Sequence, residues 1–293
     1  MNILHVDTAR EWRGGQRQLQ LLVQGLRERG HQQELVSPVP RHGLKTWPIW
    51  RLMMAARGRD VVAAHTSQAH QLCVLAGLRP VVHRRVDFPV SGGWKYRRAR
   101  GYICVSEAVR AVLNRTDSVV VPDGVAPLAP APPADLGPGR IVLAVAALVD
   151  HKDHATLARA AVGLDARVVV AGEGPLRYPD LEHLGHRNDV AALHGRADVF
   201  VHSSKLEGMG QAVIEAMQAG LPVVATRAGG VPEVVGDEGL LVPVGDADAL
   251  RAALVAALGG EHPPRSRSIR RGQAFSVQRM VEGTERAYAL FAL

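Results

Sequence analysis

The chain has 293 residues, of which 47% are hydrophobic and 22% charged, a balance that excludes a disordered chain and suits two domains of ordinary size. Aromatic residues make up only 4%, which argues against nucleic-acid binding through stacked bases. The formal charge of +7 favours anionic partners such as phosphorylated ligands or acidic lipid surfaces.

The N-terminal stretch 1–6 has an apolar run without a basic region before it, so it predicts a first strand and not a signal peptide. No uncharged apolar run reaches the ~18 residues of a membrane-spanning helix. The two cysteines, Cys73 and Cys104, lie among apolar neighbours, which predicts a reducing compartment without disulfides. We therefore expect a cytoplasmic protein, with a peripheral position at the inner membrane face as a further option.

Short apolar runs alternate with helix-like segments in the first part of the chain. The expected strands are 3–6, 34–36, 61–64, 81–82, 102–105 and 119–121. The expected helices are 16–29, 67–77 and 106–113. This alternation predicts a parallel sheet covered by helices on both faces.

A second series of the same kind follows a stretch dense in Pro, Ala and Gly. Its expected strands are 141–146, 167–171, 199–201, 222–225 and 240–242, and its expected helices are 153–162, 211–219, 247–258 and 273–291. The composition predicts a domain over 1–122, a linker over 123–139, a domain over 140–270 and a closing helix over 271–293. The fold class is α/β, and two Rossmann-like domains facing across a cleft would bind ligands at the carboxyl ends of their strands.

The segment from Glu207 to Glu215 carries the strongest functional signal. It follows an expected strand, and Gly208 and Gly210 allow close approach of the backbone to a ligand. The N–H groups at the start of the helix near Gln211 suit a diphosphate. The two carboxylates can accept hydrogen bonds from hydroxyl groups at opposite ends of that ligand.

This segment resembles the signature of the family 4 retaining glycosyltransferases, which have the GT-B fold. The matching residues are Glu207-x7-Glu215, Ala216-Met217, Ala219-Gly220, Pro222–Ala225 and Gly229-Gly230. Five further pieces fit in order: Gly14-Gly15-Gln16, Asp123-Gly124-Val125 with Asp in place of the family's Asn, Leu148 to Lys152, Val170 to Pro175, and Gly185 to Val190, which lies where the family holds the base. The resemblance is strong from about residue 139 to 260 and thinner before 122.

The resemblance implies that Glu207 contacts the donor sugar, that Glu215 contacts the ribose and that Lys152 neutralises a phosphate. Glu207 and Lys152 are therefore candidate catalytic residues. The candidate donor-binding residues are Gly14, Gly15, Lys152, Gly172, Gly174, His186, Arg187, Lys205, Glu207, Gly208, Met209, Gly210, Gln211, Ala212 and Glu215.

Three departures from the family pattern affect the expected site. Ala147 stands where the family has a phosphate-binding arginine, and only nine residues separate Pro175 from Gly185, which leaves room for only a very short helix. The family often has a catalytic histidine near position 86, where none stands. His83 and His65 are the nearest candidates, and each also suits a structural role at a strand end.

Several other groups have competing interpretations. Arg85 and Asp87 are alternatives for acceptor contact, and the basic tract 94–100 suits an anionic bilayer, a phosphorylated acceptor or merely a solvated helix face. The pair Asp246 and Asp248 fits a helix N-cap better than a metal site. His151 and His154 have no third ligand at suitable spacing, so we expect no metal.

The resemblance implies a retaining, metal-independent transfer of a sugar from a nucleotide-sugar to a cell-envelope, lipid-linked or polysaccharide acceptor. The nucleotide-sugar is a substrate, so no cofactor is expected, and neither is a nucleic-acid partner. Two alternatives stay open: a nucleotide-sugar epimerase of the same fold, and a degenerate nucleotide-sugar-binding subunit, which the alanine at 147 and the missing histidine favour.

Overall fold

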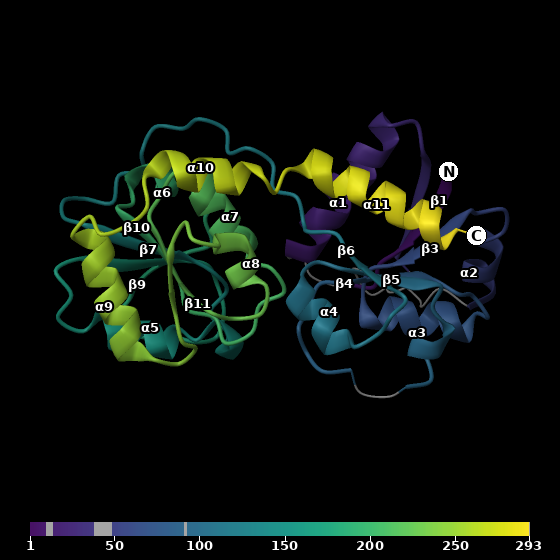
Figure 1. The fold of residues 1–293 in the computed structure, drawn as a ribbon, viewed down its shortest axis with the longest axis horizontal. Helices are drawn as coiled ribbons and strands as arrows, with labels where there is room; N and C mark the ends of the chain where they lie inside the picture. The colour runs from purple at the N-terminus through teal and green to yellow at the C-terminus, as the bar shows by residue number, and fades with distance from the viewer. Residues whose placement is uncertain (10–13, 38–48, 91–92, 293) are drawn as a thin grey trace. The chain divides into compact units, whose positions relative to one another are not determined.

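The computed structural model describes residues 1–9, 14–37, 49–90 and 93–292. The chain divides into two compact units, the first comprising Met1–Gly124 with Val277–Leu293 and the second comprising Val125–Ser276. Within the described residues, each unit contains a six-stranded parallel sheet with helices against it (Figure 1). No helix in this part of the chain is long and apolar enough to cross a membrane.

The sheet of unit 1 has the strand order β2-β1-β3-β4-β5-β6. Its strands are β1 (Asn2–Val6), β2 (Gln32–Val36), β3 (Val61–Ala64), β4 (Val81–Arg84), β5 (Gly101–Cys104) and β6 (Ser118–Val120). The helices are α1 (Gly14–Glu28), α2 (Ile49–Ala55), α3 (Ser67–Leu75), the 3-10 turn η1 (Tyr96–Arg98), α4 (Glu107–Leu113) and the C-terminal α11 (Val277–Phe291).

Helices of unit 1 begin where side chains satisfy their first backbone donors. Thr66 accepts a hydrogen bond from the backbone N–H of Ala69 at the start of α3, and Ser106 does the same for Val109 at the start of α4. Such caps replace the hydrogen bonds that the first turn of a helix lacks. They also place Thr66 and Ser106 at the carboxyl edge of the sheet.

Helix α11 returns to the first unit and packs against α1. At Gly25 of α1, a Cβ atom would lie 2.5 Å from Val281, so the two helices meet closely at a residue without a side chain. The ring of Phe291 packs equally closely on Gly101, where a Cβ atom would also clash. The buried ring of Tyr288 then joins the core beneath β1 and β4.

The sheet of unit 2 has the order β12-β11-β10-β7-β8-β9. Its strands are β7 (Ile141–Val145), β8 (Arg167–Ala171), β9 (Glu182–Gly185), β10 (Val199–His202), β11 (Val223–Thr226) and β12 (Leu240–Val242). Its helices are η2 (Asp150–Lys152), α5 (His154–Ala161), α6 (Val190–Arg196), α7 (Gln211–Gln218), α8 (Val231–Val235), α9 (Ala247–Leu258) and α10 (Arg265–Gln273).

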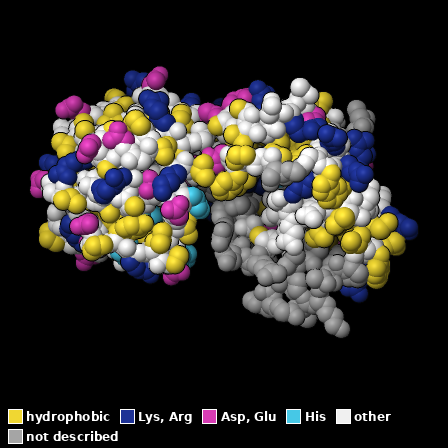
Figure 2. All heavy atoms as spheres, turned by 90° about the horizontal axis from the view of Figure 1, so that it is seen from below, with side chains coloured by type: hydrophobic (Ala, Val, Ile, Leu, Met, Phe, Trp, Pro, Cys, Tyr) yellow, Lys and Arg dark blue, Asp and Glu magenta, His cyan; other side chains and the backbone are white. Residues whose placement is uncertain are grey.

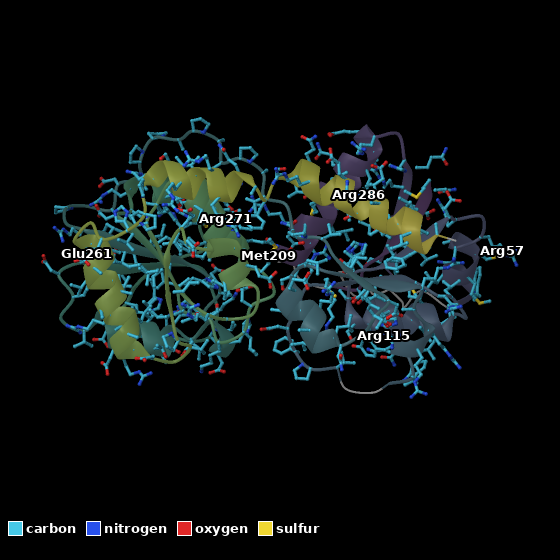
Figure 3. The ribbon with its side chains drawn as sticks, in the orientation of Figure 1. Arg57, Arg115, Met209, Glu261, Arg271 and Arg286 are labelled. Carbon is cyan, nitrogen blue, oxygen red and sulfur yellow. The ribbon has the colours of Figure 1, made fainter. Side chains whose placement is uncertain are left out.

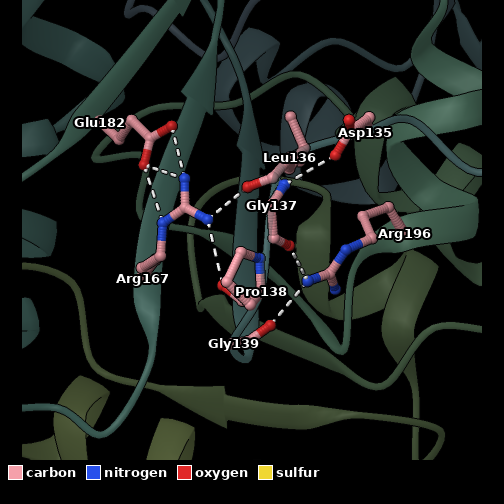
Figure 4. Close-up of polar contacts among 8 residues, drawn as sticks. All are labelled: Asp135, Leu136, Gly137, Pro138, Gly139, Arg167, Glu182 and Arg196. Carbon is pink, nitrogen blue, oxygen red and sulfur yellow. Dashed lines mark hydrogen bonds and ion pairs between the residues drawn. The ribbon is translucent and has the colours of Figure 1, made fainter.

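The end of the Pro-rich segment is fixed to unit 2 by two arginines (Figure 4). Arg167 of β8 donates to the carbonyl oxygens of Leu136 and Pro138 and forms an ion pair with Glu182 of β9. Arg196 donates to the carbonyl oxygens of residues 137 and 139 at 2.8 and 2.7 Å. These contacts tie the segment to the edge of the second sheet, and the boundary between the units falls at 124/125.

The predicted α/β class with two parallel sheets is confirmed, and each expected strand is present within about two residues of its predicted ends. Seven further elements of the described residues form where no specific element was predicted: α2, η1, η2, β9, α6, α8 and most of α10. All are short, and β9 and α10 are also rich in polar residues, so their apolar periodicity is weak. The expected very short helix after Pro175 is replaced by turns.

Candidate active site

The loop between β10 and α7 contains the predicted glycine motif. Gly210 has φ = 91°, a left-handed conformation that favours glycine. It also serves as the N-cap of α7, and no side chain caps this end of the helix. Met209, immediately before it, is buried (Figure 3). The start of α7, with Gln211 and Ala212 as its first residues, is therefore built on a tight turn, as an anion-binding helix terminus requires.

Lys152 and Glu207 form an ion pair in unit 2. The Nζ atom of Lys152 donates to Oε2 of Glu207, and both side chains are largely buried. His202, at the end of β10, places its Nε2 atom 3.2 Å from the same carboxylate oxygen. Burial alone would raise the pKa of Glu207, but the His202 contact and the Lys152 charge outweigh it and hold the pKa below its usual range. Glu207 is therefore ionised at neutral pH.

Hydrogen bonds join the loop after β7 to the loop after β10. The hydroxyl of Ser203 donates to the carbonyl oxygen of Lys152 at 2.9 Å. The backbone N–H of Lys205 donates to the carbonyl oxygen of His151. The ammonium group of Lys205 lies 3.5 Å from carboxylate oxygens of Asp150 and of Asp153. Lys205 is thus a neighbour of the Lys152 turn, but its charge is already partnered and exposed.

The second glycine loop packs directly on the loop that carries Ala147. A Cβ atom on Gly172 would lie 1.9 Å from the carbonyl oxygen of Ala146, and one on Gly174 would lie 2.3 Å from that of Leu148. Only glycine permits this approach. His154 donates from Nε2 to the carbonyl oxygen of Ala147 at 3.0 Å, while the methyl group of Ala147 is exposed. The backbone of this loop is therefore fixed, although position 147 carries no arginine.

The remaining candidates in unit 2 are Glu215, His186 and Arg187. Glu215 lies on α7 and is buried. His186 and Arg187 follow β9 on an exposed loop, where His186 contacts Asn188 at 3.1 Å and Arg187 pairs with Asp189. Gly185, just before them, accepts a hydrogen bond from the backbone N–H of Gly172, which brings this loop to the second glycine loop.

The candidates in unit 1 lie in two places. Gly14 and Gly15 are the first residues of α1, and the residues just before them, 10–13, lie outside the described part of the chain. His65 and His83 lie at the carboxyl ends of β3 and β4. Their rings stack with centroids 4.4 Å apart, and His83 Nε2 lies 2.7 Å from the hydroxyl of Tyr288.

The hydrogen bonds around His65 define which of its nitrogens carries the proton. Arg85 has only donors and approaches Nδ1 of His65 at 3.5 Å, so Nδ1 is the acceptor. Nε2–H of His65 then donates to Nδ1 of His5 at 2.9 Å, and Nε2–H of His5 donates to Oε1 of Gln33 at 2.6 Å. This series of hydrogen bonds leads from Arg85 through His65 and His5 to Gln33 on β2.

These histidines are neutral in the folded protein. Burial lowers the pKa of His5 to about 4 and lowers those of His65 and His83 well below the usual value. The other side of Arg85 donates from Nε to a carboxylate oxygen of Asp123 at 3.1 Å. The two predicted catalytic histidines thus belong to a buried hydrogen-bonded network, and their catalytic role stays a prediction.

No group of three or more His, Cys, Asp or Glu side chains in the described residues is arranged to hold a metal ion. Asp246 accepts a hydrogen bond from the backbone N–H of Ala249 and caps α9, which confirms its predicted structural role.

Residues 139–259 match the family model for the group 1 glycosyl transferases. This matching segment lies within unit 2. The segment holds nearly all of the predicted donor-binding residues, including Lys152, Glu207 and Glu215.

Two curated relatives align with parts of the chain. The O-antigen chain mannosyltransferase B of Escherichia coli is 34% identical over 123 residues, which are 40% of this chain and 31% of the relative. The N-acetyl-alpha-D-glucosaminyl L-malate synthase of Bacillus anthracis is 36% identical over 97 residues, which are 28% of this chain and 26% of the relative. The chain thus matches about a third or less of their length.

Solved structures resemble the whole described fold. HepE from Anabaena, determined in complex with UDP-glucose, has a TM-score of 0.81 at 19% identity, and the match covers 99% of this chain and 100% of that one. Sucrose-phosphate synthase from Thermosynechococcus elongatus has a TM-score of 0.77 at 18% identity, covering 99% and 98%. These likenesses confirm the predicted GT-B fold class.

His202 was not predicted from the sequence. A signal was available, because His202 is a polar residue at the carboxyl end of an otherwise apolar strand, five positions before Glu207. In folds with parallel sheets, ligands bind at the carboxyl ends of the strands. The contact with Glu207 itself depends on how the loop 203–207 turns back, which the sequence pattern does not reveal.

Proposed function

We propose that this protein is a retaining, metal-independent glycosyltransferase that moves a sugar from a nucleotide-sugar to a cell-envelope, lipid-linked or polysaccharide acceptor. The observation that carries the proposal is the Lys152–Glu207 ion pair in the family-matching unit. It brings a cation and an ionised carboxylate together in a largely buried position. A nucleotide-sugar donor offers both partners they need, a diphosphate for Lys152 and sugar hydroxyls for Glu207.

In the proposed reaction, the bond between the sugar and the diphosphate breaks while charge develops on the departing phosphate. Lys152 and the N-terminus of α7 near Gly210 are the groups that would stabilise this charge. Glu207 would exchange its bond to Lys152 for bonds from sugar hydroxyls, and its contact with His202 would keep it ionised meanwhile. Glu215 would accept hydrogen bonds from the ribose.

The neighbours differ in the donors that their names mention. HepE was solved with UDP and UDP-glucose, whereas a relative in Mycobacterium tuberculosis is named GDP-mannose-dependent alpha-mannosyltransferase. The base and the sugar of the donor are therefore the first properties to identify. We further propose that the basic tract 94–100 meets an anionic bilayer or a phosphorylated acceptor.

A thermal-shift screen of UDP-, GDP- and ADP-sugars tests the donor site. Saturation at 100 times the dissociation constant stabilises a protein by about 2.7 kcal/mol, so one nucleotide class should raise the melting temperature clearly. Transfer assays with that donor should retain their rate in excess EDTA. Failure of every nucleotide to bind would contradict the proposal, and loss of activity on chelation that Mn²⁺ or Mg²⁺ restores would contradict metal independence.

A further inference from the structure

Helix α2 exposes most of its large apolar side chains. Its seven residues include two methionines and a tryptophan, and only Leu52 is buried. Trp50 is 58% exposed and Met54 50%, and Ile49 and Met53 are exposed to nearly the same degree. Single apolar residues on a surface are normal, but several gathered on one short helix indicate a binding surface.

The charges of α2 and of the residues up to Arg59 are positive, and the next residue, Asp60, accepts a hydrogen bond from the backbone N–H of Asn2. Residues 49–59 include three arginines and no Asp or Glu. The guanidinium of Arg51 lies 5.4 Å from the ring of Trp50. Arg57 follows the end of α2 and is exposed (Figure 3). Arg59 is paired with Glu34, so Arg51 and Arg57 are the cations available to a partner.

Helix α3 connects α2 with the basic tract. It packs against α2 and carries no Asp, Glu, Lys or Arg. Two residues of α3 contact the tract. The ring of His70 lies edge-on to Tyr96, and the ammonium group of Lys95 donates to the hydroxyl of Ser67 at 2.8 Å. The tract is therefore anchored on α3 by Lys95 and Tyr96.

The rest of the tract is exposed and pairs aromatic with cationic groups. Trp94 is exposed, with the guanidinium of Arg98 6.0 Å from its ring, and Arg97 is exposed as well. The right-hand part of Figure 2, formed by unit 1, shows hydrophobic and Lys or Arg side chains with few acidic ones. We call Ile49, Trp50, Arg51, Met53, Met54, Arg57, Trp94, Arg97 and Arg98 the α2–tract surface.

We propose that the α2–tract surface docks on an anionic lipid bilayer, with the apolar side chains of α2 inserted at the level of the head groups. This inference rests on the membrane contact proposed for the tract and names α2 as its apolar anchor. Tryptophan is favoured at membrane interfaces, where its ring is partly apolar and partly polar. Arginines beside it attract lipid phosphates, and neither term alone gives firm binding.

Flotation with vesicles tests the proposal without donor or acceptor. The purified chain is mixed with neutral vesicles of phosphatidylcholine alone or with anionic vesicles of equal parts phosphatidylcholine and phosphatidylglycerol, whose negative surface attracts cationic side chains. The paired variants are Trp50→Ser/Met54→Ser for the apolar term and Arg97→Gln/Arg98→Gln for the charge term. Val255→Ser is the matched control, because Val255 is 55% exposed on α9 of unit 2.

We expect binding to the anionic vesicles and little to the neutral ones. The serine pair should weaken binding about tenfold or more, and the glutamine pair about 30-fold, since each surface cation contributes about a factor of five. Val255→Ser should bind like the parent chain. Circular dichroism and nucleotide-induced thermal shifts should be unchanged in all variants, so a failure here is distinguishable from a failure of the donor site.

Three results would overturn the proposal. One is equal or absent binding of the parent chain to the two kinds of vesicle. Another is anionic binding that the serine pair leaves intact, since α2 would then have no part in it. The third is a dimer in gel filtration that the serine pair abolishes, which would assign the surface to a second copy of the chain.

Discussion

The Nζ atom of Lys152 donates a hydrogen bond to Oε2 of Glu207, although the two residues are 55 positions apart in the chain. The same carboxylate oxygen lies 3.2 Å from Nε2 of His202. One carboxylate is thus shared by a lysine from the loop after β7 and a histidine from the end of β10. A ligand phosphate that draws Lys152 away leaves Glu207 with His202, so the carboxylate keeps a partner in its buried position.

Replacement of Lys152 by alanine should lower turnover by about 100-fold or more, because one electrostatic group in a water-excluded site is worth roughly 3–4 kcal/mol. Adding Ala147→Arg to Lys152→Ala should partly restore turnover. The exposed methyl group of Ala147 projects from a loop whose backbone is held by His154. Initial rates at saturating donor measure both effects.

Lys205→Ala is the matched control for Lys152→Ala. Its ammonium group is exposed and partnered by Asp150 and Asp153, so its removal should lower turnover much less than tenfold, because water and salt screen an exposed ion pair. Near-normal turnover of Lys152→Ala would mean that another cation serves the phosphate.

The two glutamates should respond differently to substitution. Glu215→Ala should weaken donor binding by about 1.5–3 kcal/mol, the range for hydrogen bonds to a charged group, and calorimetric titration with the donor measures this. Glu207→Gln should reduce turnover more than affinity, because in the proposed reaction its ionised carboxylate contacts the sugar being transferred. An unchanged nucleotide affinity in the Glu215 variant would refute its assignment to the ribose.

Unit 1 should lose stability as the pH falls from about 6.5 to about 4. His5, His65 and His83 have lowered pKa values in the folded protein, so below pH 6.5 the unfolded chain binds protons that the folded chain does not. The free energy of unfolding therefore falls by up to about 1.4 kcal/mol per pH unit for each histidine. Above pH 6.5 this contribution is constant.

Tryptophan fluorescence during urea unfolding measures this effect selectively. All four tryptophans occupy positions 12, 47, 50 and 94, within the range of unit 1. His83→Phe keeps an aromatic ring beside His65 and should reduce the pH slope by up to one proton. Val255→Ser is the control, because it changes an exposed side chain of unit 2 that does not titrate, and it should leave the slope unchanged. An identical slope in the His83 variant would contradict the neutral network.

His194→Leu should stabilise unit 2. Both ring nitrogens of His194 are buried without a hydrogen-bond partner, and the ring lies edge-on to Phe200. An unpaired buried polar group costs about 1–3 kcal/mol, which leucine avoids at similar volume. The melting temperature at pH 7 should rise. A fall would show that the imidazole has a partner that these contacts do not reveal.

Much of the fold and part of the site follow from local sequence pattern. Strands such as Val61–Ala64 are buried on both faces, so each forms a continuous apolar run that is recognisable on its own. The glycine turn and the helix start at Gly210 are likewise local, because a left-handed backbone favours one residue type. The same local signals placed Glu207 and Glu215 on either side of that turn.

The contacts that join distant segments were decided only by the tertiary structure. Lys152 meets Glu207 because β7 and β10 are neighbours in the sheet; the strand order carries no signature in either segment. His5, His65 and His83 come together because β1, β3 and β4 are adjacent and parallel. Helix α11 joins unit 1 through Gly25 and Tyr288, and no local pattern records which sheet a helix will cover. A sequence period sets which face of an element is buried, whereas its partner is set by the packing of the whole unit.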